Sequence, residues 1–172
     1  KDGVLKSNPA LAVTVEKNEE LERHVFSMDE VRKLLAVCRN PEARISGNRI
    51  EMEGLVQVGL YTSMRLADAV SLKWSDIDRK SQVFRFVPQK GRERGTKKKP
   101  VTIPIVEPLM TALKRLPTFE SGETYLFPSH LPPSWNGKDK IDVSYISKRF
   151  NKVVDLSGID PCMVTSEHGR KT

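Results

Sequence analysis

The sequence has only two cysteines, Cys38 and Cys162, and neither has another cysteine or a histidine at the spacing of a metal-ligand pair. Zinc sites depend on such pairs, so the sequence predicts no metal site, and nothing in it indicates a cofactor. Cys38 falls on the apolar face of a predicted helix, which favours a buried thiol in a reducing compartment. Nothing in the sequence favours a disulfide.

Long apolar runs are also missing. No run approaches the roughly 18 residues that a bilayer-spanning helix needs, and residues 1–5 contain no apolar core of a signal peptide. We therefore expect a cytoplasmic protein without a membrane partner, associated with the nucleoid when it binds DNA. The first residue is lysine rather than methionine, which suggests that the chain was cut from a longer one.

Aromatic residues make up 6% of the chain, whereas the formal net charge is +7 and the pI about 9.5. Seven basic residues and a single acidic one, Glu93, lie between Arg85 and Lys99, so most of the charge excess is local. Such a patch indicates a polyanionic partner, nucleic acid before membrane. An RNA-binding protein is the weaker hypothesis, because no strand carries the aromatic residues that stack on single-stranded bases.

Hydrophobic periodicity predicts a mainly α fold with a small antiparallel β-sheet. Ser27 and Glu30 form a capping box in front of a helix that should end near Asn40. A second helix is predicted over 50–61, and a third follows almost at once. On or near one face of the second helix lie Met52, Leu55, Val56 and Leu60. The positions expected to face inward in the third are Leu66, Ala69, Val70 and Leu72.

The sequence pattern then becomes typical of β-strands, which are predicted over 83–87 and 101–105. Pro104 argues for an edge position of the second strand. The basic residues lie between the two strands, so a hairpin should present them. Further helices are predicted after Pro108 and over 143–156, the latter ended by Gly158 and burying Ile146, Phe150, Val153 and Val154.

Residues 60–78 are the most informative segment. A turn ending in arginine precedes an acidic residue, a leucine, a tryptophan and an Asp-Ile-Asp sequence. This pattern resembles the first signature box of the tyrosine recombinase (phage integrase) family. The matching positions are Thr62, Arg65, Asp68, Leu72, Trp74, Asp76, Ile77 and Asp78. The chain departs from the pattern at Ser63, where the family usually has glycine, and has Asp68 where glutamate is commoner. Ser63 could strain a turn that requires a positive φ.

Less specific similarities to the family extend over nearly the whole chain. Lys90, in the loop after the first predicted strand, is similar to the family's catalytic lysine, and residues 101–105, 126–128 and 156–160 also fit the family layout. Asn8-Pro9-Ala10 looks like the linker that leaves an N-terminal domain. The resemblance therefore implies that residues 1–24 are a linker from a missing core-binding domain. Residues 25–172 would be a catalytic domain that is incomplete at its C-terminus.

The resemblance implies an enzyme that cuts and rejoins DNA through a 3′-phosphotyrosyl intermediate, without metal or nucleotide. Arg65 would meet the charge that develops on the non-bridging phosphate oxygens. Lys90 would donate a proton to the leaving 5′ oxygen. The other basic residues of the hairpin would contact DNA phosphates with little sequence specificity. These are Arg92, Arg94, Lys97, Lys98 and Lys99.

The family also needs a His-x-x-Arg box and, after it, a nucleophilic tyrosine. His168-Gly169-Arg170 is one residue short of that box, and helical neighbours lie three or four residues apart. No tyrosine of the chain matches the nucleophile position: Tyr61, Tyr125 and Tyr145 all lie upstream. His24 and His130 lie in predicted loops and match nothing. This chain alone is expected to be inactive, while its full-length parent would act as a homo-tetramer on paired double-stranded DNA sites.

Other interpretations remain open at this point. Arg65 could be a structural arginine paired with Asp68 or Asp76, and Trp74 is expected to pack in the core rather than to stack on a base. The chain could also be a naturally degenerate relative of the recombinases. A non-catalytic DNA-binding module that uses the basic hairpin as a clamp is the alternative function.

Overall fold

The computed structural model describes residues 25–89, 99–137 and 141–159. Their helices are α1 (Met28–Arg39), α2 (Arg49–Thr62), α3 (Leu66–Val70), α4 (Glu107–Lys114) and α5 (Val143–Ser157), with 3₁₀ turns η2 (Trp74–Asp76) and η4 (Pro128–His130). The strands are β1 (Ile77–Asp78), β2 (Val83–Phe86) and β3 (Val101–Pro104). The predicted fold class, mainly helical with a small antiparallel sheet, is confirmed.

The helix ends follow from local chemistry. Ser27 Oγ accepts a hydrogen bond from the backbone N–H of Glu30, whose carboxylate accepts one from the N–H of Ser27, so the predicted capping box is present. Asn48 caps α2 by accepting from the backbone of the first turn. Asp142 caps α5 in the same way, and Gly158, at a φ of 71°, ends that helix as predicted.

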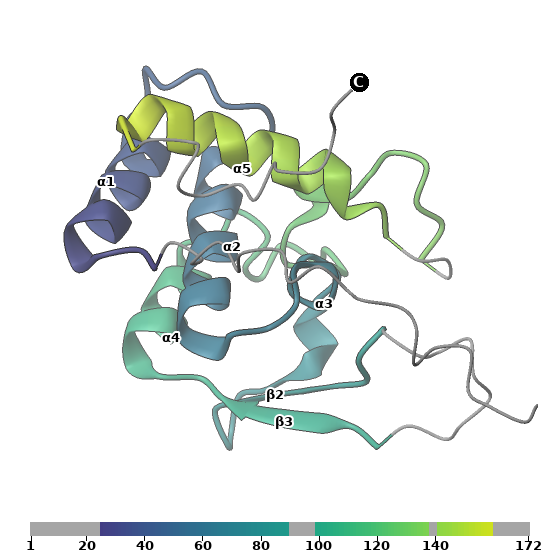
Figure 1. Cartoon of the computed structure of the whole chain (residues 1–172). Helices are drawn as coiled ribbons and strands as arrows, with labels where there is room; N and C mark the ends of the chain where they lie inside the picture. Colours follow the sequence, from purple (N-terminus) through teal and green to yellow (C-terminus); the bar gives the residue numbers. More distant parts are fainter. Residues whose placement is uncertain (1–24, 90–98, 138–140, 160–172) are drawn as a thin grey trace, which may run out of the picture.

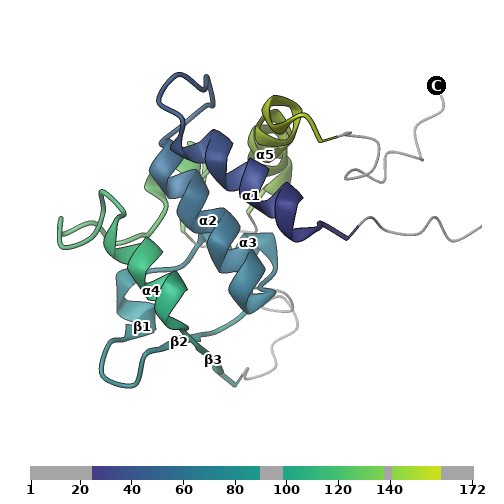
Figure 2. The same cartoon turned by 90° about the vertical axis from the view of Figure 1, so that its left-hand side faces the viewer.

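Helices α1, α2 and α5 pack together although more than 100 residues separate α1 from α5 (Figures 1 and 2). Their apolar faces share one cluster of buried side chains, which are Leu34, Cys38, Met52, Val153, Val154 and Ile159. Cys38 is 1% exposed, as the sequence predicted, and burial raises the pKa of its thiol to about 12. A thiol in this state is unreactive, so Cys38 has a packing role.

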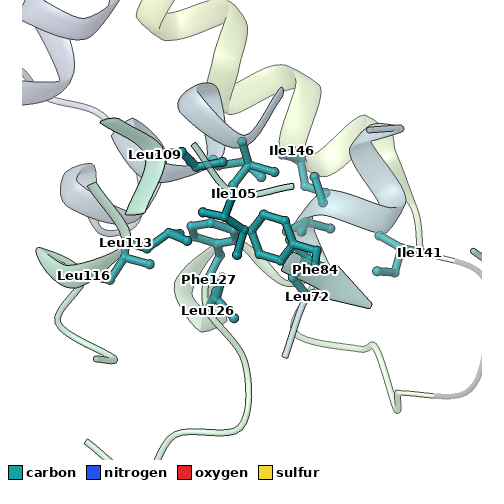
Figure 3. Packing of buried hydrophobic residues seen from close by; sticks show 14 residues of the cluster. Leu72, Phe84, Ile105, Leu109, Leu113, Leu116, Leu126, Phe127, Ile141 and Ile146 are labelled. Atoms are coloured by element: carbon teal, nitrogen blue, oxygen red, sulfur yellow. The ribbon is translucent and has the colours of Figure 1, made fainter. Parts of the chain in front are cut away.

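A larger cluster joins the sheet to the helices. Phe84 of β2, Ile105 and Phe127 lie at its centre in Figure 3, surrounded by leucines of α4 and of the following loops. Leu72 and Ile146 connect the same cluster to the end of α3 and to α5. In Figure 1 the sheet therefore lies on one side of α2 and α3 while α5 covers the other side.

The sheet has the order β1-β2-β3, with antiparallel pairing throughout. The predicted hairpin is confirmed, and Phe84 pairs with Ile103 in its register. Pro104 lies in β3, an edge strand, as the sequence predicted. The two-residue strand β1, in which Ile77 pairs with Phe84, was not predicted because it lies inside the signature segment and is too short to show an alternation.

Several side chains predicted to lie on apolar helix faces are only partly buried. Leu60, predicted to lie on or near the apolar face of its helix, is 46% exposed in the last turn of α2, where it lines an apolar groove between α1, α2 and α5. Phe150, expected to be buried by α5, lines the same groove and is only half-buried. Val56 is also half-buried, whereas Met52 and Leu55 are buried as predicted.

Candidate functional site

The turn between α2 and α3 brings Arg65 to the surface. Ser63 ends α2 in the left-handed conformation, with φ 51° and ψ 27°. The hydroxyl of Thr62 donates to the carbonyl of Val58 and accepts from the backbone N–H of Met64, so it ties both sides of the turn together. Arg65 is then the N-cap residue of α3, and its side chain is exposed. The sequence analysis anticipated this positive φ, because the family usually has glycine at the position of Ser63.

Among the described residues, Arg65 forms no ion pair, neither with Asp68 nor with Asp76. Both carboxylates are engaged elsewhere, since Asp76 accepts from the backbone N–H of Lys73 and Asp68 from that of Gln89. The structural interpretation of Arg65, as the partner of one of these two acids, is therefore wrong. An exposed planar guanidinium without an acidic partner in the described part of the chain is suited to bind a phosphate.

Three hydrogen bonds connect α3 to Gln89, the residue before Lys90. Asp68, which is 5% exposed, accepts from the backbone N–H of Gln89 at 2.7 Å. The side-chain Nε2 of Gln89 donates to Ser71 Oγ at 2.7 Å and to the carbonyl of Ala67 at 3.4 Å. We call these four residues the α3–Gln89 junction. The sequence signalled Asp68 as part of a motif, but not a partner that lies 21 residues away.

A cavity of about 240 Å³ adjoins this junction. Its lining includes Asp68, Ser71 and Gln89, together with Trp135 from the loop before α5. Trp74, three residues after Ser71, packs edge-to-face on Phe119, with ring centroids 5.6 Å apart. The predicted packing role of Trp74 is thus confirmed.

Most of the predicted basic site falls outside the described residues, namely Lys90, Arg92, Arg94, Lys97 and Lys98. Lys99 is described and is exposed, two residues before β3. Phe86 and Val101 are paired in the sheet, so the segment between them leaves and re-enters the hairpin at one end. In Figure 1 this end of the sheet lies at the lower right, and α3 lies above it.

A second polar cluster lies between α2, η4 and α5. Glu51, 3% exposed, accepts from the backbone N–H and from the hydroxyl of Ser129, at 2.9 and 2.8 Å. Burial raises the pKa of the Glu51 carboxyl, although the hydrogen bonds from Ser129 act in the opposite direction. The Ser129 hydroxyl also accepts from the backbone N–H of Asn48, so this serine joins η4 to the start of α2.

His130 is completely buried in this cluster and lies in the 3₁₀ turn η4, where the sequence predicted a loop. Its Nδ1 lies 3.3 Å from the guanidinium of Arg149, which can only donate, so Nδ1 accepts. Nε2 therefore carries the proton and donates to the carbonyl of Asn48 at 2.9 Å. Burial lowers the pKa of His130 to about 4, and the nearby Arg149 charge acts in the same direction. Only a position between three elements explains this burial, and the sequence carries no signal for it.

The tyrosines occupy structural or peripheral positions. Tyr145 accepts a hydrogen bond from Arg149, whose guanidinium also lies 4.3 Å from the centre of its ring. Tyr125 packs on Trp135, while Tyr61 is 43% exposed near the end of α2. Across residues 25–89, 99–137 and 141–159, no three potential ligands among His, Cys, Asp and Glu are grouped to hold a metal ion. In the same residues, no helix has the length and apolarity required to cross a bilayer.

The fold and the exposed arginine at the α2–α3 turn define a helical domain with a hairpin-bearing small sheet. A sequence profile of the phage integrase family matches residues 24–172, and the chain belongs to that family. The predicted resemblance to the tyrosine recombinases is thereby confirmed. None of the curated proteins compared with the chain matches it.

Among solved structures, the chain is similar to the crystal structure of XerA recombinase, with a TM-score of 0.55 and 21% sequence identity. The match covers 84% of this chain and 48% of the XerA chain, so the chain spans about half the length of that protein. At this level of identity the likeness establishes a shared fold.

Proposed function

We propose that this chain is part of the catalytic domain of a site-specific recombinase that cuts and rejoins double-stranded DNA through a 3′-phosphotyrosyl intermediate. The observation that carries the proposal is the exposed Arg65, free of its neighbouring acids, on a helix that is hydrogen-bonded to the residue preceding Lys90. Membership of the phage integrase family supports the same assignment.

In the proposed reaction, a tyrosine oxygen bonds to the phosphorus while the bond from phosphorus to the 5′ oxygen breaks. Arg65 binds the non-bridging oxygens, on which negative charge accumulates in the pentacoordinate transition state. Lys90 supplies the proton that the leaving 5′ oxygen takes up, and the phenolic proton is released. The 5′ hydroxyl of a partner strand reverses these steps, so the energy of the phosphodiester is conserved.

We place the nucleophilic tyrosine and the His-x-x-Arg box in a longer parent protein, outside this chain. Tyr145 is engaged with Arg149, and Tyr125 with Trp135, which supports that placement. Residues 1–24 are proposed to be the linker from a core-binding domain, and residues 25–172 the catalytic part. The parent is proposed to act as a homo-tetramer on paired sites, in the cytoplasm and on the nucleoid.

The basic hairpin residues Arg92, Arg94, Lys97, Lys98 and Lys99 are proposed to contact phosphates. Phe86 and Val101, which flank this segment in the sequence, are paired in the sheet, and this pairing supports a common role for the basic residues between them. Their contribution should depend steeply on salt, since each neutralised phosphate releases counterions.

The test is covalent capture of DNA by the full-length parent. A pool of nicked duplexes of random sequence is incubated with the protein, and DNA that stays bound after denaturation is recovered. We expect an adduct, formed about 100- to 1,000-fold more slowly by Arg65→Ala because one donor to the transition-state charge is lost. Arg32→Ala is the matched control, because Arg32 is also exposed but pairs with Asp29 on α1.

Absence of an adduct, with salt-sensitive DNA binding retained, would instead support the clamp alternative. In that case Arg65→Ala would weaken DNA binding no more than Arg92→Ala does. The concentration of basic residues in the hairpin segment is the observation that supports this second function.

A further inference from the structure

Glu53 of α2 is a charged residue that is only 3% exposed. Three groups donate hydrogen bonds to its Oε1. The donors are Arg39 Nε at 2.8 Å, Gln57 Nε2 at 3.1 Å and Arg115 Nη1 at 3.3 Å. A buried carboxylate needs such partners, and these bonds join the end of α1 and the end of α4 to the middle of α2.

Two arginines are one more than this carboxylate requires. Arg39 and Arg115 donate to the same oxygen, so their guanidiniums lie side by side and share a single negative charge. A guanidinium has five N–H donors, and each of these two uses one of them on Glu53, with no further partner among the described residues. Both side chains are half-exposed, at 53% and 51%. The pair therefore presents one surplus positive charge, and N–H groups that are still available, to the surface.

A recess of about 460 Å³ adjoins the two arginines. It lies against α2, between α1 and α4, which flank that helix in Figure 2. Between its ends, the lining combines apolar side chains with two hydroxyl groups. These side chains are Leu35, Tyr61, Pro108, Thr111 and Ala112. The recess is thus neither a purely apolar groove nor a purely charged surface.

The two ends of the recess differ in charge. Glu107 is the first residue of α4 and Arg115 follows its last, so about 12 Å of helix separates them. Both residues line the recess, and Glu107 is exposed. A ligand that satisfies both ends has a carboxylate at the arginine end and a cation about 12 Å away from it.

We propose that this recess binds a peptide segment of a partner protein, whose carboxylate side chain is held by Arg39 and Arg115. The carboxylate neutralises the surplus charge and accepts hydrogen bonds from both guanidiniums, while an apolar side chain of the peptide covers the apolar part of the lining. An extended peptide advances about 3.3 Å per residue, so a lysine four residues from the carboxylate reaches Glu107. A DNA backbone offers the anion but neither the apolar side chain nor the cation.

The test titrates the 172-residue chain with fluorescently labelled probe peptides. The first probe is Lys-Leu-Ala-Leu-Glu with blocked ends, and the second has the reverse order, because the two charges do not fix the direction of the peptide backbone. Fluorescence anisotropy measures the dissociation constants. We expect saturable binding of at least one order, weakened about 10-fold when glutamine replaces the glutamate and about threefold when it replaces the lysine.

Variants of the two arginines locate the carboxylate. Arg39→Gln and Arg115→Gln should each weaken binding about 10-fold, because each removes charge-assisted hydrogen bonds. Arg32→Gln is the matched control. It removes the same charge from an exposed arginine of α1 that pairs with Asp29 and does not line the recess, so binding should change less than about twofold.

A further variant leaves the hydrogen bonds of Glu53 intact, since loss of an arginine also affects the fold. Thr111→Glu adds a carboxylate at an exposed position of the recess and should weaken binding about 10-fold in a chain that unfolds at an unchanged urea concentration. Glu107→Gln should remove the preference for the peptide with lysine over its glutamine form, because the two charges act as a pair.

Absence of saturable binding by every peptide would overturn the inference. An equal loss in Arg32→Gln would overturn it as well, because binding would then follow the net charge of +7 rather than a site. A short DNA duplex that depends on Arg39 and Arg115 more than on Arg32, while no peptide binds, would make the recess a phosphate site instead. None of these results involves Arg65 or covalent capture, so the proposed function is tested separately.

Discussion

Glu51 of α2 and Asp68 of α3 are both buried carboxylates that accept a backbone hydrogen bond from a residue far along the chain. Glu51 holds Ser129, 78 residues away, and Asp68 holds Gln89, 21 residues away. In each case a charged side chain replaces the apolar contact that usually fixes a loop against a helix. Buried carboxylates are tolerated in such positions because their oxygens are hydrogen-bonded.

The surroundings of the two carboxylates differ. Around Glu51, the neighbouring polar groups Ser129, His130 and Arg149 are bonded to each other or to backbone carbonyls. Around Asp68, a 240 Å³ cavity remains and the Oε1 of Gln89 is buried without a hydrogen-bond partner among the described residues. Saturated networks rigidify a fold, whereas groups left without partners are found where a protein acts on something else. The comparison therefore indicates a role in stability for the first region, whereas the second is the region that the proposed function uses.

The largest expected effect is a loss of stability on acidification, caused by His130 in the region around Glu51. The pKa of His130 is about 4 in the folded chain, against about 6.5 for an ordinary histidine, so below pH 6.5 the unfolded chain binds a proton that the folded chain does not. The contribution of His130 to the free energy of unfolding should fall by about 3 kcal/mol as the pH drops from 6.5 to 4, and this contribution does not change above 6.5. The raised pKa of Glu51 acts in the opposite direction, so the loss is assigned to His130 by comparison with His130→Gln. Urea unfolding at a series of pH values measures the fall.

The other two histidines provide the matched control. A variant with His24→Gln and His168→Gln should keep the pH dependence between 6.5 and 4, because we assign that dependence to His130, the histidine that is buried among the described residues. His130→Gln should be less stable at neutral pH and should lose that dependence. Retention of the full pH dependence in His130→Gln would contradict the assignment.

Substitution of Glu51 and of Asp68 tests whether the two regions differ in their effects on stability and on activity. Glu51→Ala leaves two donors of Ser129 without their acceptor and should lower the free energy of unfolding by about 2 to 3 kcal/mol. Asp68→Ala frees one donor and should cost about 1 to 2 kcal/mol. In the full-length parent, the rate of adduct formation per folded molecule should fall only in Asp68→Ala. Equal losses of activity in the two variants would remove the distinction between the regions.

The smallest effect is expected at Ser63. A left-handed conformation costs a residue other than glycine about 1 kcal/mol, part of which is offset by the greater freedom of glycine when unfolded. Ser63→Gly should therefore raise the free energy of unfolding by about 0.5 kcal/mol. Ser63→Ala, which keeps a Cβ at the same φ, should not. The thermal midpoints of the three proteins, compared in one buffer, measure the difference.

The sequence predicted what depends on local order. The capping box at Ser27, the five helices, the hairpin and the edge position of Pro104 all follow from periodicity, capping and the geometry of proline. The family assignment followed from one segment in which eight positions keep their register. These features need no knowledge of which segments meet in space.

What the sequence did not predict are partners that tertiary structure supplies. Glu51 and Asp68 are charged residues, for which the general expectation is exposure, and only the backbone groups of Ser129 and Gln89 allow them to be buried. His130 has no helical or strand pattern around it. Leu60 has the right period, but it lines a groove between the helices and is 46% exposed. The roles of Lys90 and of the other hairpin cations stay predictions.

The packing of α1 against α5 has a consequence for the folding of the protein during its synthesis on the ribosome. The chain emerges with its N-terminus first, so Leu34 and Met52 are synthesised about a hundred residues before Val153, which helps to bury them. Contacts of such large sequence separation are slow to form, and apolar surface that waits for them is exposed to chaperones and to other nascent chains. Translation speed between α2 and α5 should therefore influence how much of this protein reaches its native state.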